Sequence, residues 1–116
     1  MNPANASMLT LVKALAVAKG ISKSTGLEPA IKWPNDVVIN GRKIVGILTE
    51  MSAQIDYVNH IVVGSGINVH QKNFPEELAA KATSLDMEMR RLGKEDRIYR
   101  AAVLAAVLAC MSIVLI

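Results

Sequence analysis

The chain has 116 residues, is 52% hydrophobic and only 3% aromatic, and carries a formal net charge of +3. This length limits it to one domain, and the hydrophobic fraction excludes an intrinsically disordered chain. Its basic residues are scattered rather than gathered in a stripe, which argues against nucleic acid as a partner.

The first predicted element is a helix that ends at Gly20 or at Gly26. Its apolar positions recur at helical spacing: Leu9, Val12, Leu15 and Ala16. The same segment has some features of a secretory signal, but no basic side chain precedes its apolar run and Lys13 interrupts it. We therefore expect a helix of the fold rather than a cleaved leader.

Three predicted strands follow and are connected in order as a meander: residues 31–39, 43–51 and 57–69. Asn40 and Gly41 separate the first two strands and form the pair preferred in a type I′ hairpin turn, because both tolerate a positive φ. Gln54 and Asp56 mark the turn before the third strand.

Two helices are predicted after the sheet. Residues 74–77 (FPEE) open a short helix with acidic side chains in its first turn, and residues 92–96 lead into a last, alanine-rich helix. The apolar run 101–116 is shorter than the ~20 residues of a membrane span, so we expect no membrane association. The one cysteine, Cys110, cannot form an internal disulfide, which predicts a cytoplasmic protein.

Polar groups and glycines interrupt all three predicted strands. Pro34 cannot donate to a sheet ladder, which indicates a bulge or distortion of the kind found beside active sites. Gly46 weakens the second strand unless something approaches it closely, and Gly64 and Gly66 do the same in the third. A solvated edge strand or a twisted strand explains each feature separately, but their coincidence in three neighbouring strands predicts a small-molecule site.

Several motifs, in this order, resemble the central segment of the catalytic domain of biotin–protein ligases. They are residues 32–36 (KWPND), 41–48 (GRKIVGIL), 64–69 (GSGINV) and 82–85 (ATSL). The resemblance extends over residues 3–108, whereas residues 109–116 are atypical of the family. It implies an α+β fold of the class II synthetase-like biotin/lipoate ligase type, in which a mixed β-sheet is flanked by helices.

The resemblance implies a ligase that joins biotin to ATP, giving biotinyl-5′-AMP and pyrophosphate, and then transfers the biotinyl group to a lysine of a biotin carboxyl-carrier protein. Lys43 would be the catalytic residue, because a point charge on a flexible stem can reach both the biotin carboxylate and the α-phosphate. The resemblance assigns biotin binding to Lys43, Gly46 and Gly64, and ATP binding to Asn35, Asp36, Gly66 and Asn68. Asp36 would also help to hold Mg²⁺ on the phosphates.

Members of that family also carry a glycine- and arginine-rich loop that folds over biotin and the adenylate, a Ser/Thr-containing stretch that binds the ureido ring, and a small C-terminal domain. We find none of these in residues 1–116 and therefore expect a partial catalytic domain with impaired activity. Uncovered sheet edges in such a piece favour association into a homodimer.

Other interpretations stay open at this point. The chain could be a non-catalytic fragment or pseudoenzyme with residual nucleotide binding. A lipoate ligase or transferase shares the fold, but that family places its lysine differently and lacks the KWPND motif. The C-terminal apolar helix could also hold the protein on a membrane. Cell fractionation would distinguish this alternative from a soluble protein. A repressor role would need a DNA-binding domain that we do not find in the sequence.

Overall fold

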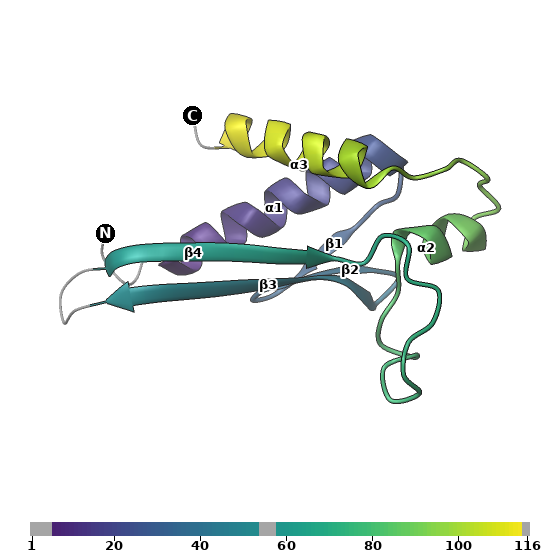
Figure 1. The fold of residues 1–116 in the computed structure, drawn as a ribbon, viewed down its shortest axis with the longest axis horizontal. Helices are drawn as coiled ribbons and strands as arrows, with labels where there is room; N and C mark the ends of the chain where they lie inside the picture. Colours follow the sequence, from purple (N-terminus) through teal and green to yellow (C-terminus); the bar gives the residue numbers. More distant parts are fainter. Residues whose placement is uncertain (1–5, 54–57, 115–116) are drawn as a thin grey trace.

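One antiparallel sheet lies against a long helix, which a second long helix covers in turn, in the structure, a computed structural model that describes residues 6–53 and 58–114 (Figure 1). The strands, in their spatial order, are β1 (Ala30–Lys32), β2 (Asp36–Ile39), β3 (Arg42–Ala53) and β4 (Val58–Ile67). The helices are α1 (Ala6–Thr25), α2 (Leu85–Arg91) and α3 (Arg100–Val114). This architecture confirms the expected α+β class. The sheet was expected to be mixed, but its four strands pair antiparallel. Within the described residues, the parallel pairing is one isolated bridge between Lys43 and Ala82.

Helix α1 continues through Gly20 and ends at Thr25, directly before Gly26, so Gly26 is the correct one of the two predicted stops. Gly26 has φ 77° and donates its N–H to the Ser22 carbonyl at 2.9 Å, so it is the left-handed residue that closes the helix. Gly20 is glycine for a different reason: a Cβ there would lie 2.6 Å from Val107 Cγ2 and 2.7 Å from Val107 Cα. Helices α1 and α3 therefore cross in direct contact at Gly20.

The predicted strand 31–39 is wrong as a single strand. Residues 33–35 form a turn with a cis Trp33–Pro34 bond, and the two halves, β1 and β2, pair antiparallel with Lys32 opposite Asp36. Pro34 thus lies in a turn rather than in the expected strand bulge, which accommodates its missing N–H.

The hairpin turn between β2 and β3 is confirmed. Asn40 has φ 52° and Gly41 has φ 77°, as a type I′ turn requires at both central residues. The predicted strands 43–51 and 57–69 correspond to β3 and β4, which pair antiparallel along their length. Gln54 and Asp56, which we expected in the next turn, lie outside the described residues.

The short helix predicted at residues 74–77 is absent. Pro75 instead accepts two turn hydrogen bonds through its carbonyl, from the N–H of Leu78 at 2.8 Å and of Ala79 at 3.0 Å. A helix, α2, begins only at Leu85, because the Ser84 hydroxyl accepts the N–H of Met87 at 3.2 Å as an N-cap. The last predicted helix is present as α3. Over the ranges that the structure describes, no helix has the length and apolar character needed to cross a membrane.

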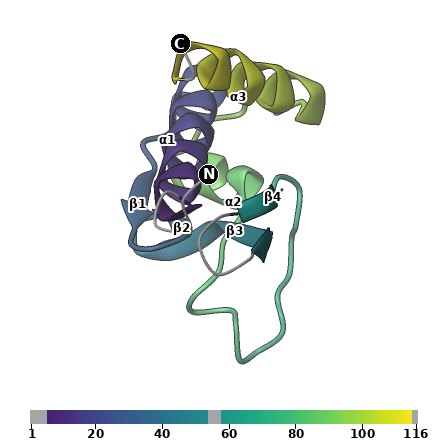
Figure 2. The same ribbon diagram turned by 90° about the vertical axis from the view of Figure 1, so that its left-hand side faces the viewer.

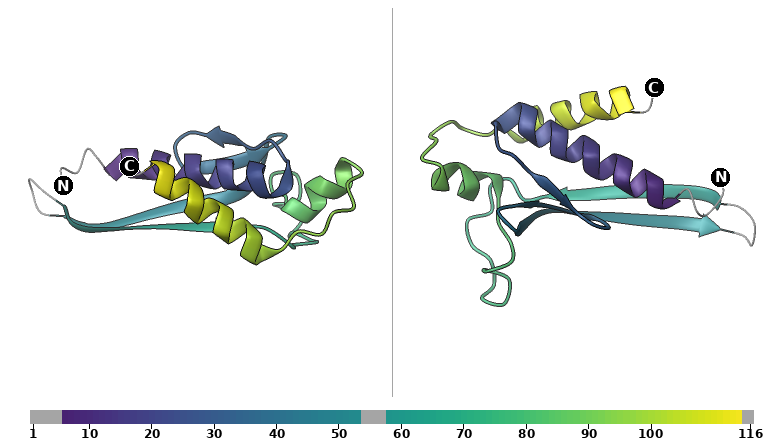
Figure 3. Two further views of the ribbon diagram at one scale, coloured as in Figure 1. Left: turned by 90° about the horizontal axis from the view of Figure 1, so that it is seen from above. Right: turned by 180° about the vertical axis from the view of Figure 1, so that it is seen from behind.

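The elements are stacked in layers, with α1 between the sheet and α3 (Figures 1 and 2). The buried side chains of the sheet, which include Val37, Val45 and Ile47, pack in one core with Val17 and Ile21 of α1. Seen from above, α3 crosses over α1 (Figure 3). Residues 70–82 extend away from the helices, on the other side of the sheet (Figures 1 and 2). The sheet therefore has a covered face against α1 and an opposite face, which we call the open face.

Candidate functional site

A row of residues without large side chains crosses the open face of the sheet. Asp36, Gly46 and Gly66 are direct partners across β2, β3 and β4, and Leu48 lies opposite Gly64 in a neighbouring row. Directly opposed residues of antiparallel strands present their side chains on the same face. Because Val45 and Ile47 alternate with these residues and are buried against α1, the row lies on the open face.

The glycines leave the backbone of this face uncovered. A Cβ built at Gly66 would meet nothing within 4 Å, and one at Gly64 would have the Leu48 carbonyl oxygen, 3.9 Å away, as its nearest neighbour. At Gly46 a Cβ would lie 3.2 Å from both Cε and Nζ of Lys43. The lysine side chain therefore lies over Gly46, while the backbone around Gly64 and Gly66 has room for a ligand.

A β-bulge brings Lys43 to the open face. The register changes between Val37, which faces Val45, and Val38, which faces Lys43, so Ile44 is the extra residue of β3. Without this bulge, strand alternation would put Lys43 on the same face as the buried Val45. Bulges redirect side chains in this way, and the distortion that we expected at Pro34 occurs here instead.

Lys43 and Asp36 form an ion pair on the open face. The distance from Lys43 Nζ to Asp36 Oδ1 is 3.2 Å, and the side chains are 51% and 27% exposed. A half-exposed pair of this kind contributes only about 0–1 kcal/mol to stability. The lysine can therefore exchange this carboxylate for another anion at little cost.

The backbone of Lys43 is held on its other side by the ATSL stretch. Lys43 N–H donates to the Lys81 carbonyl at 2.7 Å, and Thr83 N–H donates to the Lys43 carbonyl at 2.9 Å. Together with the parallel bridge to Ala82, these hydrogen bonds fix the main chain from which the lysine side chain extends.

Asn35 and Asn68, both predicted to bind ATP, donate to main-chain carbonyls beside this row. Asn35 Nδ2 donates to the Ile47 carbonyl at 3.2 Å, and Asn68 Nδ2 donates to the Thr83 carbonyl at 3.3 Å. These two amides therefore hold main-chain segments on either side of Lys43. Their contacts with a nucleotide stay predictions.

A buried polar cluster beside the site was not predicted from the sequence. Glu88 is 1% exposed and accepts hydrogen bonds from Thr83 Oγ1 at 2.6 Å and from Asn40 Nδ2 at 3.2 Å, and it also pairs with Arg91. We call Asn40, Thr83, Glu88 and Arg91 the Glu88 network. From the sequence, only the Glu88–Arg91 pair could have been predicted, because these residues are three positions apart on a helix. Asn40 and Thr83 lie outside that helix, so no helical spacing relates them to Glu88.

Asp36 can supply one ligand to a Mg²⁺ ion but cannot form a complete site. Among the residues that the structure describes, no three His, Cys, Asp or Glu side chains gather closely enough to hold a metal. Mg²⁺ in nucleotide sites takes one or two carboxylates together with phosphate oxygens and water. The donor set here therefore suits an ion that arrives with a nucleotide.

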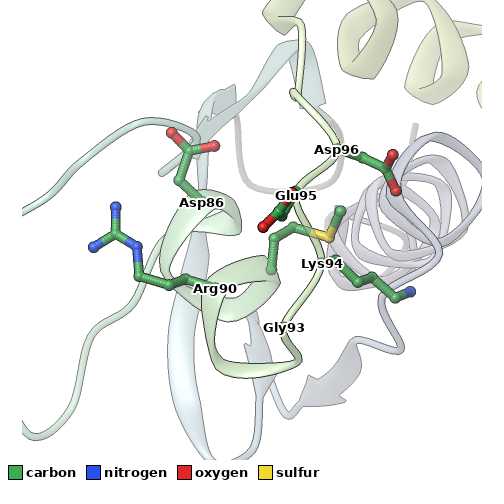
Figure 4. A pocket seen from close by; sticks show the side chains of 7 residues that line it. Asp86, Arg90, Gly93, Lys94, Glu95 and Asp96 are labelled. Atoms are coloured by element: carbon green, nitrogen blue, oxygen red, sulfur yellow. The ribbon is translucent and has the colours of Figure 1, made fainter.

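Two surface cavities bear on where ligands could bind. One, of about 390 Å³, lies between α2 and the segment that follows it (Figure 4), and none of its lining residues was predicted to be functional: Asp86, Met89, Arg90, Gly93, Lys94, Glu95 and Asp96. Its lining carries both acidic and basic side chains, so its charge does not favour either an anionic or a cationic ligand. The other, of about 270 Å³, includes Asn35 and Leu48 in its lining, together with the 67% exposed Trp33. The lining of the second cavity also includes Thr10 of α1, Ile47 and Thr49 and none of the glycines, so this cavity lies between α1 and the turn at residues 33–35 rather than over the row of glycines.

Comparison with known proteins gives concordant matches. Residues 1–68 match the model of the biotin/lipoate A/B protein ligase family. A bifunctional ligase/repressor BirA from Bacillus subtilis is 47% identical over 104 residues, which are 88% of this chain and 30% of the relative. A biotin–[acetyl-CoA-carboxylase] ligase from Paracoccus denitrificans is 44% identical over 66 residues, which are 55% of this chain and 28% of the relative.

A solved structure extends the likeness to the whole chain. The biotin protein ligase from Aquifex aeolicus in complex with biotin and ATP superposes with a TM-score of 0.75 at 37% identity, over 99% of this chain and 47% of that one. The chain thus spans less than half the length of each of these relatives.

Proposed function

The chain belongs to the biotin/lipoate A/B protein ligase family, and from this membership we propose that it acts in biotin–protein ligation. The proposed reaction joins biotin to ATP, releasing pyrophosphate, and then transfers the biotinyl group from the adenylate to a lysine of a carboxyl-carrier protein. One observation carries the proposal: Lys43 extends over Gly46 on the open face, beside Asp36 and next to the uncovered backbone at Gly66.

The first step requires two anions to approach each other. A carboxylate oxygen of biotin attacks the α-phosphorus, a new P–O bond forms, and the bond to the leaving pyrophosphate breaks. The Lys43 ammonium lowers the repulsion between carboxylate and phosphate and stabilises the charge that develops on the phosphate oxygens. Its weak, half-exposed pair with Asp36 lets it turn toward the substrates when they bind.

In the second step, the amine of the carrier lysine attacks the carbonyl carbon of the adenylate, an amide bond forms, and AMP leaves. Lys43 remains close to the departing phosphate and balances its charge. We assign biotin contacts to Lys43, Gly46 and Gly64, where the missing side chains allow close approach of a ligand. We assign ATP contacts to four residues: Asn35, Asp36, Gly66 and Asn68.

Mg²⁺ is proposed to accompany ATP, with Asp36 as its protein ligand. When bound, the ion would neutralise charge on the phosphates. Asp36 is suited to this role because its carboxylate lies on the open face and is partly exposed.

The proposed setting of the reaction is the cytoplasm, where the carrier protein would be encountered. The free, buried Cys110 is compatible with a reducing compartment. We also propose that two copies of the chain associate through β4, because this strand lies at the end of the sheet order and leaves one side of its backbone unpaired in the described fold.

Biotin-dependent exchange of labelled pyrophosphate into ATP tests the proposed function directly. The purified chain with Mg²⁺ should catalyse exchange only when biotin is present, and circular dichroism should show that the sample is folded. Absence of exchange in a folded sample would contradict the catalytic proposal. ATP binding without exchange would instead support the alternative of a non-catalytic nucleotide-binding protein.

A further inference from the structure

Glu88 is a buried carboxylate that the proposed chemistry does not use. Its side chain is 1% exposed, yet it has hydrogen-bond donors on both oxygens: Asn40 on Oε1, and Thr83 and Arg91 on Oε2. A buried charge is costly unless it is paired and fully hydrogen-bonded. The four side chains therefore form a satisfied unit whose position in the fold needs an explanation.

Two of these three partners, Asn40 and Thr83, come from the two segments that hold Lys43, whereas Arg91 lies on α2 with Glu88. Asn40 is the first residue of the type I′ turn that leads into β3, where Lys43 is the second residue. Thr83 donates its N–H to the Lys43 carbonyl at 2.9 Å and its hydroxyl to Glu88 at 2.6 Å. Glu88 thus joins, through one side chain, the turn before Lys43 and the segment 81–83 that is hydrogen-bonded to the Lys43 backbone.

We propose that Glu88 is a positioning residue for Lys43, holding the β2–β3 turn against α2 so that the lysine stays directed over Gly46. The inference rests on the proposed function for its catalytic meaning, but its structural content does not depend on biotin or ATP. Lys43 needs such support because its side chain is 51% exposed, its partner Asp36 is a weak restraint, and the bulge at Ile44 interrupts the sheet ladder beside it.

The acceptor chemistry of the network requires a carboxylate rather than an amide. Arg91 and the Asn40 amide nitrogen can only donate, and they approach different oxygens of Glu88. In Glu88→Gln, the new NH₂ group would face a donor in either orientation, toward Asn40 or toward Arg91. The substitution has nearly the same volume, so it would loosen the network without creating a cavity.

The test uses two variants that weaken the same link from opposite ends. Glu88→Gln removes an acceptor, and Asn40→Gly removes the donor while keeping a residue that readily adopts positive φ. Glu77→Gln is the matched control, because Glu77 is an exposed carboxylate in a turn outside the network. Asn40→Gly also carries the test if Glu88→Gln does not fold.

The first readout is the set of NMR signals from the backbone amide and the ε-methylene group of Lys43 in the ligand-free, folded chain. Both network variants should shift these signals, and Glu77→Gln should leave them in place. A purely structural role would lower the melting temperature without moving Lys43 in the folded state. Unchanged Lys43 signals in both variants would overturn the inference, whatever the activity.

The second readout is pyrophosphate exchange. Misplacement of a catalytic group by about 1 Å can cost on the order of 100-fold in rate, so both variants should reduce kcat by about 10- to 100-fold and leave KM for biotin close to that of the unmodified chain. Loss confined to KM would overturn the positioning role. Shifted Lys43 signals in a chain that shows no exchange at all would contradict the proposed function and leave the positioning of Lys43 by Glu88 standing.

Discussion

At the scale of single residues, the site consists of the Lys43 side chain, its ion-pair partner Asp36 and the glycines of β3 and β4. Lys43 contributes little to the stability of the fold, because its side chain is half-exposed and its ion pair with Asp36 is weak. The glycines at 46, 64 and 66 likewise give up side-chain packing in two adjacent strands, which weakens a sheet. Both features are unfavourable or neutral for folding and become understandable if a ligand binds on the open face.

Lys43→Ala should abolish biotin-dependent pyrophosphate exchange while changing the free energy of unfolding by less than about 1 kcal/mol. Its charge is the one placed to cancel the repulsion between carboxylate and phosphate, and its backbone hydrogen bonds to Lys81 and Thr83 are kept in the variant. Lys23→Ala, on α1, serves as the control lysine. Exchange at the unmodified rate in Lys43→Ala would refute the role given to this residue.

Gly66→Ala should fold as well as the unmodified chain but bind ATP about tenfold more weakly, a difference of about 1.4 kcal/mol. The added methyl meets no protein atom within 4 Å, so it does not disturb the fold and interferes only with a ligand that needs the space. Titration calorimetry with ATP and Mg²⁺ measures the effect. Ser65→Ala is the control, because the neighbouring side chain of a strand points to the opposite face. Equal affinities in the two variants would remove Gly66 from the site.

At this scale, the residues that the sequence could identify were those within short motifs. Short sequence motifs identified Lys43, Gly46 and Gly66 as site residues. In the structure, Gly46 and Gly66 lie opposite each other in one row, and the Lys43 side chain lies over Gly46. Asn40 was predicted correctly as a turn residue. Its hydrogen bond to Glu88 was not predicted, because it joins segments that no local pattern relates.

At the scale of elements, the crossing of α1 and α3 depends on Gly20. Gly20→Ala should destabilise the fold by about 1–3 kcal/mol, as overpacking of a tight contact does. The new Cβ would meet Val107 side-chain and backbone atoms at 2.6–2.7 Å, and the backbone cannot be relieved by a rotamer change. Urea denaturation measures the loss, with Ser22→Ala on the exposed side of α1 as the control.

The double variant Gly20→Ala/Val107→Ala distinguishes a backbone clash from a side-chain clash. It should recover only part of the lost stability, because Val107 Cα and N remain close to the added methyl. Full recovery would mean that the Val107 side chain alone sets the distance between the helices.

Helix and strand boundaries show where sequence reasoning ends. Both Gly20 and Gly26 are reasonable helix stops locally, and the choice between them depends on Val107, a tertiary neighbour of Gly20. The bulge at Ile44 is hidden for a related reason: Ile44 and Val45 are both apolar and both buried, so their alternation carries no information about the face of Lys43.

The helix predicted at residues 74–77 failed because acidic residues after a proline are also typical of turns. The Pro75 carbonyl accepts turn hydrogen bonds there, and the side-chain cap that starts a helix is supplied by Ser84 instead.

At the scale of the whole molecule, the layers divide stability from function. Helix α1 covers one side of the sheet (Figure 1). The buried core lies on that side, and the opposite face carries Lys43, Asp36 and the glycines. Substitutions on the open face should therefore affect ligands more than folding. This separation is what allows the variants at Lys43 and Gly66 to be interpreted as effects on chemistry.

Strand β4 lies at the end of the sheet order. Its Val62 side chain is exposed on the open face. If two copies pair along this strand, the mass measured by sedimentation should rise toward a dimer as concentration increases. Val62→Lys should shift the distribution to monomer, because an added charge on an edge strand opposes strand pairing. Leu92→Lys is the control, because Leu92, at the end of α2, is as exposed as Val62 and receives the same added charge. It should leave association unchanged. A monomer mass at every concentration would exclude pairing through β4, and monomerisation by Leu92→Lys alone would locate the interface near α2 instead.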